Sequence, residues 1–422
     1  MKIRAVKGVK DILPEEMVRW RFIESESRKT LEEHGFSEIR IPIFEYTDLF
    51  ARSIGEATDI VEKEMYTFED SKGGSISLRP EGTAGVVRSC IEHNRLGATS
   101  VNKLYYMGPM FRHERPQKGR YRQFYQIGAE VLGTDNPLTD AEVLAMLHLL
   151  FQRLGIKDTV LQINSLGCKA CRPTYRQALT DFLATQQESL CENCRRRSRL
   201  NPLRVLDCKS SACKAATQNA PTVLASLCRE CMDHFEAVKK PLDELAVPYE
   251  VNERLVRGLD YYTRTAFEMV TESLGAQNAV AAGGRYDGLV EELGGPPTAG
   301  IGFAIGMERL AALLPERDDL GGRKPLYLAP LGEAAMKRVA LLLYKLRSAG
   351  VAAETSYLGN SLKSQLRHAG KLGAGFVGIL GEDELSEGVI LVKDMEKKEQ
   401  VKIALDVFVA EMTERLARRL RE

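Results

Sequence analysis

The stretch Tyr105–Gly133, YYMGPMFRHERPQKGRYRQFYQIGAEVLG, decides how the rest of this 422-residue chain is interpreted. Its pattern predicts two β-strands, Tyr105–Glu114 and Arg122–Leu132. The basic loop between them bends at Pro116 and Gly119, whose backbone geometry suits a turn better than a sheet ladder. We therefore expect an antiparallel hairpin at the centre of a sheet.

The second strand of this hairpin alternates cleanly between two faces. One face can sit on a core and consists of Gln123, Tyr125, Ile127, Ala129 and Val131. The other offers an aromatic plane, an amide, a carboxylate and a glycine that lets a ligand approach the backbone; it consists of Arg122, Phe124, Gln126, Gly128 and Glu130. Arg112 and Glu114 share a face of the first strand. An ordinary hairpin with one solvated face explains this alternation equally well.

The composition is that of an ordinary folded protein, with 44% hydrophobic and 28% charged residues. The length exceeds one core and predicts two to four domains. A formal net charge of +1 predicts no polyanionic partner by itself. No apolar run is long enough to cross a bilayer, and the first residues, MKIRAVKGVKDILPEE, lack the apolar segment of a secretory signal. We expect no membrane association and a cytoplasmic location.

Local signals place the first elements. A helix should begin near Pro14 and end near Glu33, and a strand with an internal proline should follow at Ser37–Ile43. The peptide Leu78–Thr83, LRPEGT, leads into a helix from Ala84 to His93 for which Thr83 is the expected cap. Further helices and strands are expected at Met65–Phe68, Ser75–Arg79, Asn136–Leu154, Val160–Ser165, Tyr262–Thr271 and Gly306–Leu314.

Changes in pattern divide the chain. Residues 1–166 and 248–320 are predicted to be two parts of one sheet domain, interrupted at 167–247 by a helical insertion. Residues 324–422 form a separate small α/β domain, because strands and helices alternate along it. Its elements are expected at Leu326–Ala329, Glu333–Ala349, Val351–Thr355, Leu362–Leu372, Phe376–Leu380, Val389–Asp394, Glu399–Ala404 and Asp406–Leu420.

The insertion holds eight of the nine cysteines. They form three C-x2-C pairs and one C-x4-C pair: Cys168–Cys171, Cys191–Cys194, Cys228–Cys231 and Cys208–Cys213. In a reducing compartment such pairs are typical of structural zinc, because two thiolates on one tight turn can share a tetrahedral ion. Free cysteines tolerated on helix faces explain the same spacing. The sequence leaves both interpretations open.

Three further peptides carry chemically useful groups. Arg257–Tyr262, RGLDYY, places a cation, a carboxylate and two phenols beside a glycine. Ala282–Gly288, AGGRYDG, reads as a glycine-rich loop along which a ligand can lie. Gly300–Leu310, GIGFAIGMERL, reads as a strand that enters a helix with Arg309 on its first turn, a natural site for an anion. Protease, hydrolase and P-loop signatures are absent from the sequence.

Taken together, these peptides resemble those of a known family. The strand with Pro42, the FRHE hairpin and GIGFAIGMERL are similar to motifs 1, 2 and 3 of class II aminoacyl-tRNA synthetases. RGLDYY and AGGRYDGL resemble the two signature peptides of histidyl-tRNA synthetases, and the resemblance covers essentially the whole chain. It implies an α+β catalytic domain with a mainly antiparallel sheet flanked by helices, a helical insertion that closes over the tRNA acceptor arm, and a C-terminal α/β anticodon-binding domain.

The resemblance also implies a reaction and a homodimer that forms through motif 1. Histidine attacks the α-phosphate of ATP, with Mg²⁺ bridging the phosphates, and the histidyl group then passes to the 3′ end of tRNA(His). By the same resemblance, Arg112 holds the α-phosphate, Arg309 the γ-phosphate, and Phe124 stacks on adenine. Glu114 faces the adenine or the metal-bound phosphates. Arg257 contacts both the α-phosphate and the substrate carboxylate from the opposite side.

For histidine, the resemblance implies a polar pocket. The α-ammonium group is accepted by Glu81, Thr83 and Gln126. Glu130 and Tyr262 bind the two imidazole nitrogens, and Tyr261 lines the pocket. Such a site rejects analogues that leave its buried polar groups unpaired, which explains selection without an editing domain.

Contacts with tRNA follow from the resemblance as well. The acceptor end meets the basic loop through Gln117, Lys118, Arg120 and Arg122. In the C-terminal domain, Lys363, Arg367 and Lys371 lie on one helix face, which is either a solvated stripe or a phosphate-binding surface. Two other functions remain to be weighed. One is a regulatory paralogue that binds histidine for an ATP phosphoribosyltransferase, and the other is an amino-acid ligase that acts without tRNA.

Overall fold

The computed structural model describes residues 3–55, 58, 60–97, 100–116, 119–259, 261–274, 278–316, 324–359 and 361–419. The chain folds into two compact units, Met1–Glu316 and Arg317–Glu422. In the described residues, no helix is both long and apolar enough to span a bilayer.

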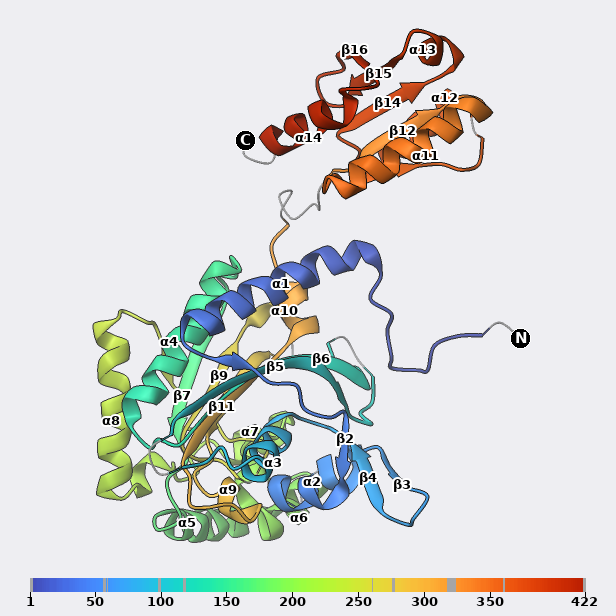
Figure 1. Ribbon diagram of the computed structural model, residues 1–422. Coiled ribbons are helices and arrows are strands. Elements are labelled where there is room, and N and C mark those ends of the chain that lie inside the picture. Colours follow the sequence, from blue (N-terminus) through green and yellow to red (C-terminus); the bar gives the residue numbers. More distant parts are fainter. Residues whose placement is uncertain are drawn as a thin grey trace. The chain divides into compact units, whose positions relative to one another are not determined.

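An eight-stranded sheet forms the centre of the first unit (Figure 1). Its inner strands pair antiparallel, and only the outermost strands, β1 and β8, run parallel to their neighbours. In spatial order the strands are β1 (Ser37–Glu38), β5 (Asn102–Phe111), β6 (Gln123–Leu132), β11 (Gly300–Gly306), β10 (Ala279–Arg285), β9 (Thr263–Val270), β7 (Val160–Ser165) and β8 (Glu250–Val251). The sheet is therefore mainly antiparallel, as predicted.

Helices cover both faces of this sheet. Figure 1 shows α1 (Pro14–Glu33), α4 (Pro137–Arg153) and α10 (Met307–Leu313) over one face. On the other face lie α2 (Thr47–Ile54), α3 (Thr83–Glu92) and α9 (Leu289–Glu292). A three-stranded sheet of β2 (Phe44–Tyr46), β4 (Ser75–Leu78) and β3 (Thr67–Glu69) lies beside α2, and a π-helical turn spans Ile60–Glu64.

The β5–β6 hairpin forms as predicted, with Gly108 opposite Gln126 and Met110 opposite Phe124. Its two faces also divide as expected: Tyr125 packs edge-on against Trp20 of α1, with ring centroids 5.2 Å apart, whereas Phe124 lines a pocket on the opposite face. The alternative of one solvated face is wrong. From Ile127 to Leu132 the strand is buried on both sides, because helices cover both.

Two sequence expectations need correction. The strand expected at Ser37–Ile43 pairs only at Ser37–Glu38, because Pro42 has no N–H and Arg79 binds the carbonyl oxygens of Ile41 (2.8 Å) and Pro42 (3.3 Å). The glycine-rich loop expected at Ala282–Gly288 is mostly strand β10. Its glycines serve close strand packing, since a Cβ on Gly283 would lie 2.2 Å from the carbonyl oxygen of Gly302.

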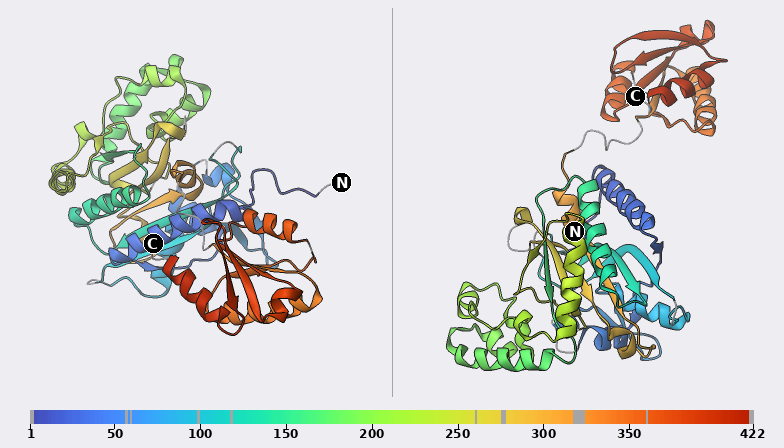
Figure 2. Two further views of the ribbon diagram at one scale, coloured as in Figure 1. Left: turned by 90° about the horizontal axis from the view of Figure 1, so that it is seen from above. Right: turned by 90° about the vertical axis from the view of Figure 1, so that its left-hand side faces the viewer.

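The cysteine-rich segment lies between β7 and β8 and is helical, as predicted. It contains α5 (Arg172–Thr185), α6 (Glu192–Leu200), α7 (Ser211–Ala216) and α8 (Arg229–Glu244), with 3-10 turns at Gln187–Ser189, Pro202–Val205 and Leu224–Ser226. The first three helices share a small core around Tyr175, Leu179 and Leu183. Helix α8 leaves that core and runs alongside α4 (Figures 1 and 2).

The second unit is a five-stranded sheet with helices on both faces. Its strands are, in spatial order, β13 (Ala353–Thr355), β12 (Leu326–Pro330), β14 (Phe376–Leu380), β15 (Val389–Asp394) and β16 (Gln400–Ala404). Helices α11 (Glu333–Ser348) and α14 (Phe408–Arg419) pack on one core, and α12 (Leu362–Lys371) packs on another. The sequence missed only the short helix α13 (Glu382–Ser386) among the described elements of this unit.

A fully buried ion pair ties the first unit together. Arg285 at the end of β10 donates from Nε to both carboxylate oxygens of Asp140 on α4, at 2.8 and 3.0 Å. Asp140 also accepts the hydroxyl of Thr265 on β9 at 2.6 Å, and Arg285 reaches Asp287 at 2.9 Å. Neither side chain of the central pair is exposed. Removing Asp140 would break both of its bonds to the buried guanidinium of Arg285 and would leave Asp287 as the carboxylate that this guanidinium still contacts.

Asp140→Ala should therefore lower the free energy of unfolding of the first unit by about 3–5 kcal/mol. The only tryptophan, Trp20, is buried in α1, so its fluorescence during urea denaturation follows this unit. Glu142→Ala is the matched control on the same helix. It removes a partly exposed pair with Lys103 (2.7 Å) and should cost at most about 1 kcal/mol. Equal losses in both variants would contradict the anchoring role of Asp140.

Candidate active site

A pocket on the face of the central sheet gathers most of the residues that the sequence singled out. It is floored by β5, β6, β10 and β11 and bordered by the segments around residues 81–83 and 257–262. Among the residues that line it are Glu81, Thr83, Arg112, Glu114, Arg120, Phe124, Gln126, Arg257, Tyr261, Tyr262 and Arg309. Glu130 lies behind this lining and Arg122 outside it, and Gln117 and Lys118 are outside the described residues.

Glu81 supplies a buried carboxylate at one end of the pocket. It accepts the backbone N–H groups of Thr83 (2.6 Å) and Ala84 (2.9 Å) at the start of α3. Burial raises its pKa, although these two hydrogen bonds oppose the shift. The expectation that Thr83 caps this helix is therefore wrong: Glu81 takes the free amides, and the Thr83 hydroxyl donates to Glu130 at 2.7 Å instead.

Glu130 is a second buried carboxylate, on strand β6. Its oxygens accept the hydroxyls of Thr83 (2.7 Å) and Tyr286 (2.6 Å). It lies opposite Gly302, where a Cβ would come within 1.8 Å of Oε2, so only glycine leaves room for the carboxylate. Burial raises the pKa of Glu130 to about 8, and Glu81 contributes to this rise as a nearby like charge.

Three tyrosines complete this end of the pocket. The rings of Tyr261 and Tyr262 lie 4.6 Å apart, and Tyr106 enters from β5. Cβ atoms on Gly82 or Gly128 would lie 2.2 and 2.1 Å from the Tyr106 ring, so both glycines make space for that phenol. Burial raises the pKa of all three tyrosines, which keeps their hydroxyls neutral and able to donate. Gln126 Oε1 is buried without a hydrogen-bond partner among the described residues.

Arg257 also lines the pocket. It forms an ion pair with Glu268 of β9, and its guanidinium carbon lies 5.2 Å from the centre of the Tyr262 ring. Only 12% of its side chain is exposed. The position of the Arg257 guanidinium therefore depends on its ion pair with Glu268 of β9.

Guanidinium groups gather at the other end. Arg112 donates to the carbonyl oxygen of Pro80 (2.9 Å) and lies 5.3 Å from the centre of the Phe124 ring. Arg309 donates to the carbonyl oxygens of Gly119 (3.2 Å) and Ala279 (2.5 Å). Burial lowers the pKa of Arg309, and the nearby charges of Arg120 and Arg112 lower it further. Three guanidinium groups in one end of the pocket make that end suited to phosphate.

Glu114 is the acidic group within this basic end. Its carboxylate lies 2.7 Å from Arg120 and 4.0 Å from Arg112. A carboxylate placed beside a phosphate site is a hard oxygen ligand of the kind that Mg²⁺ prefers.

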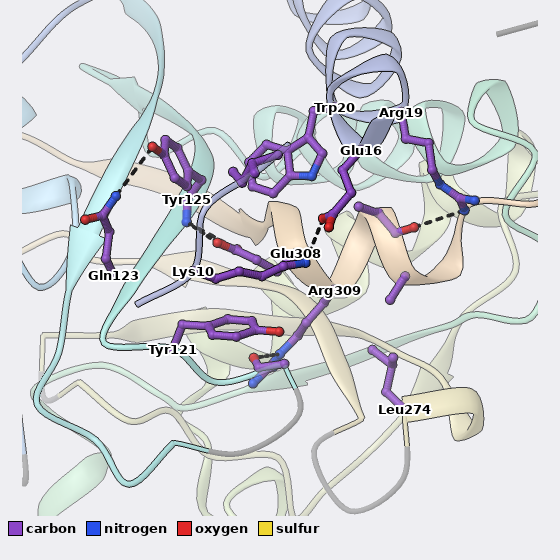
Figure 3. A pocket seen from close by; sticks show the side chains of 14 residues that line it. Lys10, Glu16, Arg19, Trp20, Tyr121, Gln123, Tyr125, Leu274, Glu308 and Arg309 are labelled. Carbon is purple, nitrogen blue, oxygen red and sulfur yellow. Dashed lines mark hydrogen bonds and ion pairs between the residues drawn. The ribbon is translucent and has the colours of Figure 1, made fainter. Parts of the chain in front are cut away.

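A neighbouring pocket lies between α1, β6 and α10 and shares Gly119, Tyr121, Glu308 and Arg309 with the first (Figure 3). Glu308 points into it and accepts the backbone N–H of Tyr125 at 2.9 Å. Burial raises the pKa of Glu308 to about 7. Lys10 lies beside Glu308 but pairs with Glu16 at 2.7 Å (Figure 3). Arg309 therefore lines both pockets.

Sequence reasoning missed three residues that hold the site. Tyr286 fixes Glu130, Glu268 fixes Arg257, and Tyr106 fills the space above Gly82 and Gly128. Tyr286 and Tyr106 lie within the peptides AGGRYDG and YYMGP that the sequence had marked, so their position was a usable signal. The sequence carried no signal for Glu268, because this residue meets Arg257 only through the pairing of β9 with its neighbours.

Comparisons with known proteins agree with this geometry. Residues 8–310 match the family model "Histidyl-tRNA synthetase", and residues 326–415 match "Anticodon binding domain". The chain is 55% identical to a histidine–tRNA ligase of Syntrophotalea carbinolica, covering 96% of this chain and 97% of that one. It is 56% identical to the same enzyme of Geobacter sulfurreducens, with equal coverage. The solved apo histidyl-tRNA synthetase of S. aureus matches with a TM-score of 0.82 at 40% identity, covering 98% of this chain and all of that one.

The antiparallel sheet with its motif 2 hairpin and its motif 3 strand and helix defines a class II aminoacyl-tRNA synthetase fold. Because the family model spans most of the chain and relatives exceed 50% identity over nearly all of it, the chain belongs to the histidyl-tRNA synthetase family.

The raised pKa of Glu130 predicts a pH-dependent stability. A carboxyl whose folded pKa lies above its unfolded value, here about 8 against an ordinary 4.5, stabilises the fold at low pH and loses that contribution as the pH rises. Glu130→Gln cannot ionise. The free energy of unfolding of the unliganded variant, relative to wild type, should increase by about 1.4 kcal/mol per pH unit between pH 5.5 and 7.5.

Urea denaturation followed by Trp20 fluorescence measures this difference. Glu142→Gln, at a carboxylate with 40% of its side chain exposed, is the matched control and should run parallel to wild type across the same pH range. A constant offset between Glu130→Gln and wild type would contradict the burial-driven shift.

Proposed function

We propose that this chain activates L-histidine with ATP to histidyl-adenylate and then transfers the histidyl group to the 3′ end of tRNA(His). The observation that carries the proposal is one pocket that has the buried carboxylate of Glu81 at one end, with that of Glu130 directly behind Thr83, and a group of guanidiniums at the other end. Histidine offers an ammonium and an imidazole to the first end, and ATP offers phosphates to the second. The relatives above, which carry the same activity in their names, support it.

The histidine end has matched donors and acceptors. Glu81, Thr83 and the free Oε1 of Gln126 are proposed to accept the α-ammonium group. A neutral imidazole has one N–H donor and one acceptor nitrogen, and Glu130 and Tyr262 supply one acceptor and one donor for them. Tyr261 packs between Tyr262 and Tyr286 and closes the pocket around the ring. An amino acid without the imidazole leaves these buried groups unpaired, which is the basis of selectivity.

At the other end, Phe124 is proposed to stack on adenine, Arg112 to hold the α-phosphate and Arg309 the γ-phosphate. An oxygen of the histidine carboxylate attacks the α-phosphorus, the phosphorus–oxygen bond to the β-phosphate breaks, and pyrophosphate leaves. Negative charge builds on the α-phosphate oxygens as this happens, and Arg112 and Arg257 approach it from opposite sides. Mg²⁺ bound with ATP neutralises phosphate charge, and Glu114 is the residue placed to contact the metal-bound phosphates or the adenine.

In the second step, a ribose hydroxyl of the tRNA attacks the histidyl carbonyl and AMP leaves. Arg120 and Arg122, together with Gln117 and Lys118 outside the described residues, are proposed to meet the acceptor end. We also retain residues 167–247 as the domain that closes over the acceptor arm, inserted into a catalytic domain of residues 1–166 and 248–320. Residues 324–422 would bind the anticodon region, where Lys363, Arg367 and Lys371 form an exposed stripe on α12.

A homodimer is part of the proposal. Large apolar side chains remain exposed where the motif 1 segment enters the three-stranded sheet: Ile43, Phe44, Tyr46 and Phe68 are 45–69% exposed. A second copy that packs through motif 1 would cover them. We place the enzyme in the cytoplasm, where charged tRNA is consumed.

The regulatory paralogue is not favoured. Its role does not require an anticodon-binding domain, an intact phosphate end or the basic hairpin loop. This chain has a C-terminal unit that matches the anticodon-binding model, and its Arg112, Arg257 and Arg309 line one pocket. The same two features disfavour an amino-acid ligase that acts without tRNA.

ATP–pyrophosphate exchange measured with each of the twenty amino acids tests the proposed reaction. We expect exchange with histidine alone, because only histidine pairs both buried carboxylates. Transfer of labelled histidine to tRNA(His) tests the second step. Histidine binding with neither exchange nor charging would instead support the regulatory role.

Arg257→Ala should lower histidine-dependent exchange by about 10²–10³-fold, because its charge acts mainly in the transition state. Since this variant leaves the carboxylate of Glu268 unpaired, Arg257→Ala/Glu268→Gln should show a similar loss, which separates the missing cation from the stranded anion. Arg153→Ala, which removes a surface pair with Glu33, is the matched arginine control and should retain wild-type exchange. Near-normal exchange in both Arg257 variants would refute the role of this residue.

A further inference from the structure

The eight cysteines of the inserted segment meet as two separate groups of four. The first group, cluster 1, consists of Cys168, Cys171, Cys228 and Cys231. The second, cluster 2, consists of Cys191, Cys194, Cys208 and Cys213. Within each cluster, all four sulfur atoms lie within 4.8 Å of one another. Each cluster thus joins two of the cysteine pairs that the sequence showed only as separate turns.

The sulfur separations fit one tetrahedral ion per cluster. Four thiolates at 2.3 Å from a zinc ion lie about 3.8 Å from each other. In cluster 1 the Sγ atoms of Cys168 lie 3.7 Å from Cys171 and 3.8 Å from Cys228, and Cys171 lies 3.8 Å from Cys231. In cluster 2, Cys191 and Cys208 are 4.0 Å apart. Because two packed thiols also touch at about this distance, the stronger observation is that four sulfur atoms converge in each of two clusters.

Other cysteine chemistries fit less well. A disulfide needs sulfur atoms about 2.05 Å apart, and all nine cysteines of the chain are free. The thiolates of a four-iron cluster each bind a different iron atom, so they lie farther apart than four ligands of one ion. A closed site of four sulfur ligands is the arrangement of structural zinc, which needs no open coordination position.

The surroundings of both clusters suit bound thiolates. The backbone N–H of Cys168 donates to Sγ of Cys171 at 3.1 Å, and that of Cys191 donates to Sγ of Cys213 at 3.2 Å. Such donors orient the ligands and stabilise their negative charge. In every pair the second cysteine is buried and the first is partly exposed. Each site is therefore enclosed by protein on one side and open to an entering ion on the other.

We propose that each cluster binds one structural Zn²⁺, so that the chain carries two. Cluster 1 joins the start of α5 to the start of α8, close to the point where the chain leaves strand β7 of the catalytic sheet. Cluster 2 joins the start of α6 to α7 inside the small core of that segment. The ions replace apolar contacts that so small a core cannot provide.

Cluster 1 is also linked to the histidine end of the pocket. Arg172, the residue after Cys171, donates to the carbonyl oxygen of Tyr262 at 3.0 Å. On the other side of the cluster, Gly167 accepts the backbone N–H of Arg264 at 2.9 Å. Loss of this ion would release both contacts with the start of β9. Arg172 and Gly167 are thus positioning residues, and this link rests on the proposed role of Tyr262.

Metal analysis of the full chain, purified without chelator, tests the two sites directly. We expect two zinc ions per chain by mass spectrometry, and X-ray absorption at the zinc edge should show four sulfur ligands near 2.3 Å. Fewer than two zinc ions, iron in place of zinc, or nitrogen and oxygen ligands would overturn the assignment. This readout is independent of any activity, so it separates the metal proposal from the proposed reaction.

Paired substitutions then assign each ion to its cluster. Cys171→Ser/Cys231→Ser and Cys194→Ser/Cys213→Ser should each reduce the zinc content to one, whereas Cys90→Ser, a buried cysteine outside both clusters, should leave two. Two zinc ions retained in either double variant would overturn the ligand sets. If a double variant does not fold, the wild-type metal count and absorption spectrum still decide the proposal.

The link to the pocket has its own readout. The cluster 1 variant should raise the KM for histidine in ATP–pyrophosphate exchange about tenfold with a smaller change in kcat, because ground-state binding at Tyr262 is loosened. The cluster 2 variant should change this KM less. Equal KM values in wild type and the cluster 1 variant would overturn the link while leaving the two metal sites in place.

Discussion

The buried pair of Arg285 and Asp140 is the constraint on which the arrangement of the site depends. It joins β10 to α4 with no solvent exposure, and Thr265 of β9 adds a third attachment. Tyr286, the next residue after Arg285, is thereby fixed and donates to Glu130. One short peptide thus performs two tasks. Arg285 holds the sheet to its covering helix, and Tyr286 orients the carboxylate proposed to read the imidazole. A pair this deeply buried is costly unless every partner is present, which explains why the peptide carries so many polar groups.

The two ends of the pocket carry opposite charges. Glu81 lies close enough to Glu130 to raise its pKa, and burial raises the pKa of both carboxylates. At the other end, Arg112 and Arg120 lie close enough to Arg309 to lower its pKa. A ligand with a cation at one end and phosphates at the other offsets the like charges at both ends of the pocket. The adenylate-forming pair of substrates has this distribution, so the electrostatics of the pocket and the family assignment point to the same reaction.

Sequence patterns predicted what depends on local periodicity. The alternation along Arg122–Leu132 predicted both faces of β6, and the limits of β7, β14 and β15 were predicted to the residue. The errors arose where tertiary contacts override local signals. The glycines of AGGRYDG resemble a loop but serve close strand packing, and the strand expected at Ser37–Ile43 ends early because Arg79 takes its carbonyl groups. The roles of Tyr286 and Glu268 required strand register, which no local pattern supplies.

The combination of the cysteine pairs into clusters could likewise not be predicted from local sequence patterns. Spacing identifies a pair on one turn, yet four pairs can combine into two sites in three ways, and only the fold selects one. Because β7 and β8 pair in parallel, the chain between them must cross back along the sheet, and α8 (Arg229–Glu244) makes the last part of that return. The start of α8 lies near the end of β7, since Cys228 and Cys168 are 3.8 Å apart. Cluster 1 forms at that junction, and Arg172 beside it contacts Tyr262, the residue that precedes β9. The topology of the sheet therefore places the proposed zinc site where it can hold both the insertion and the histidine end of the pocket.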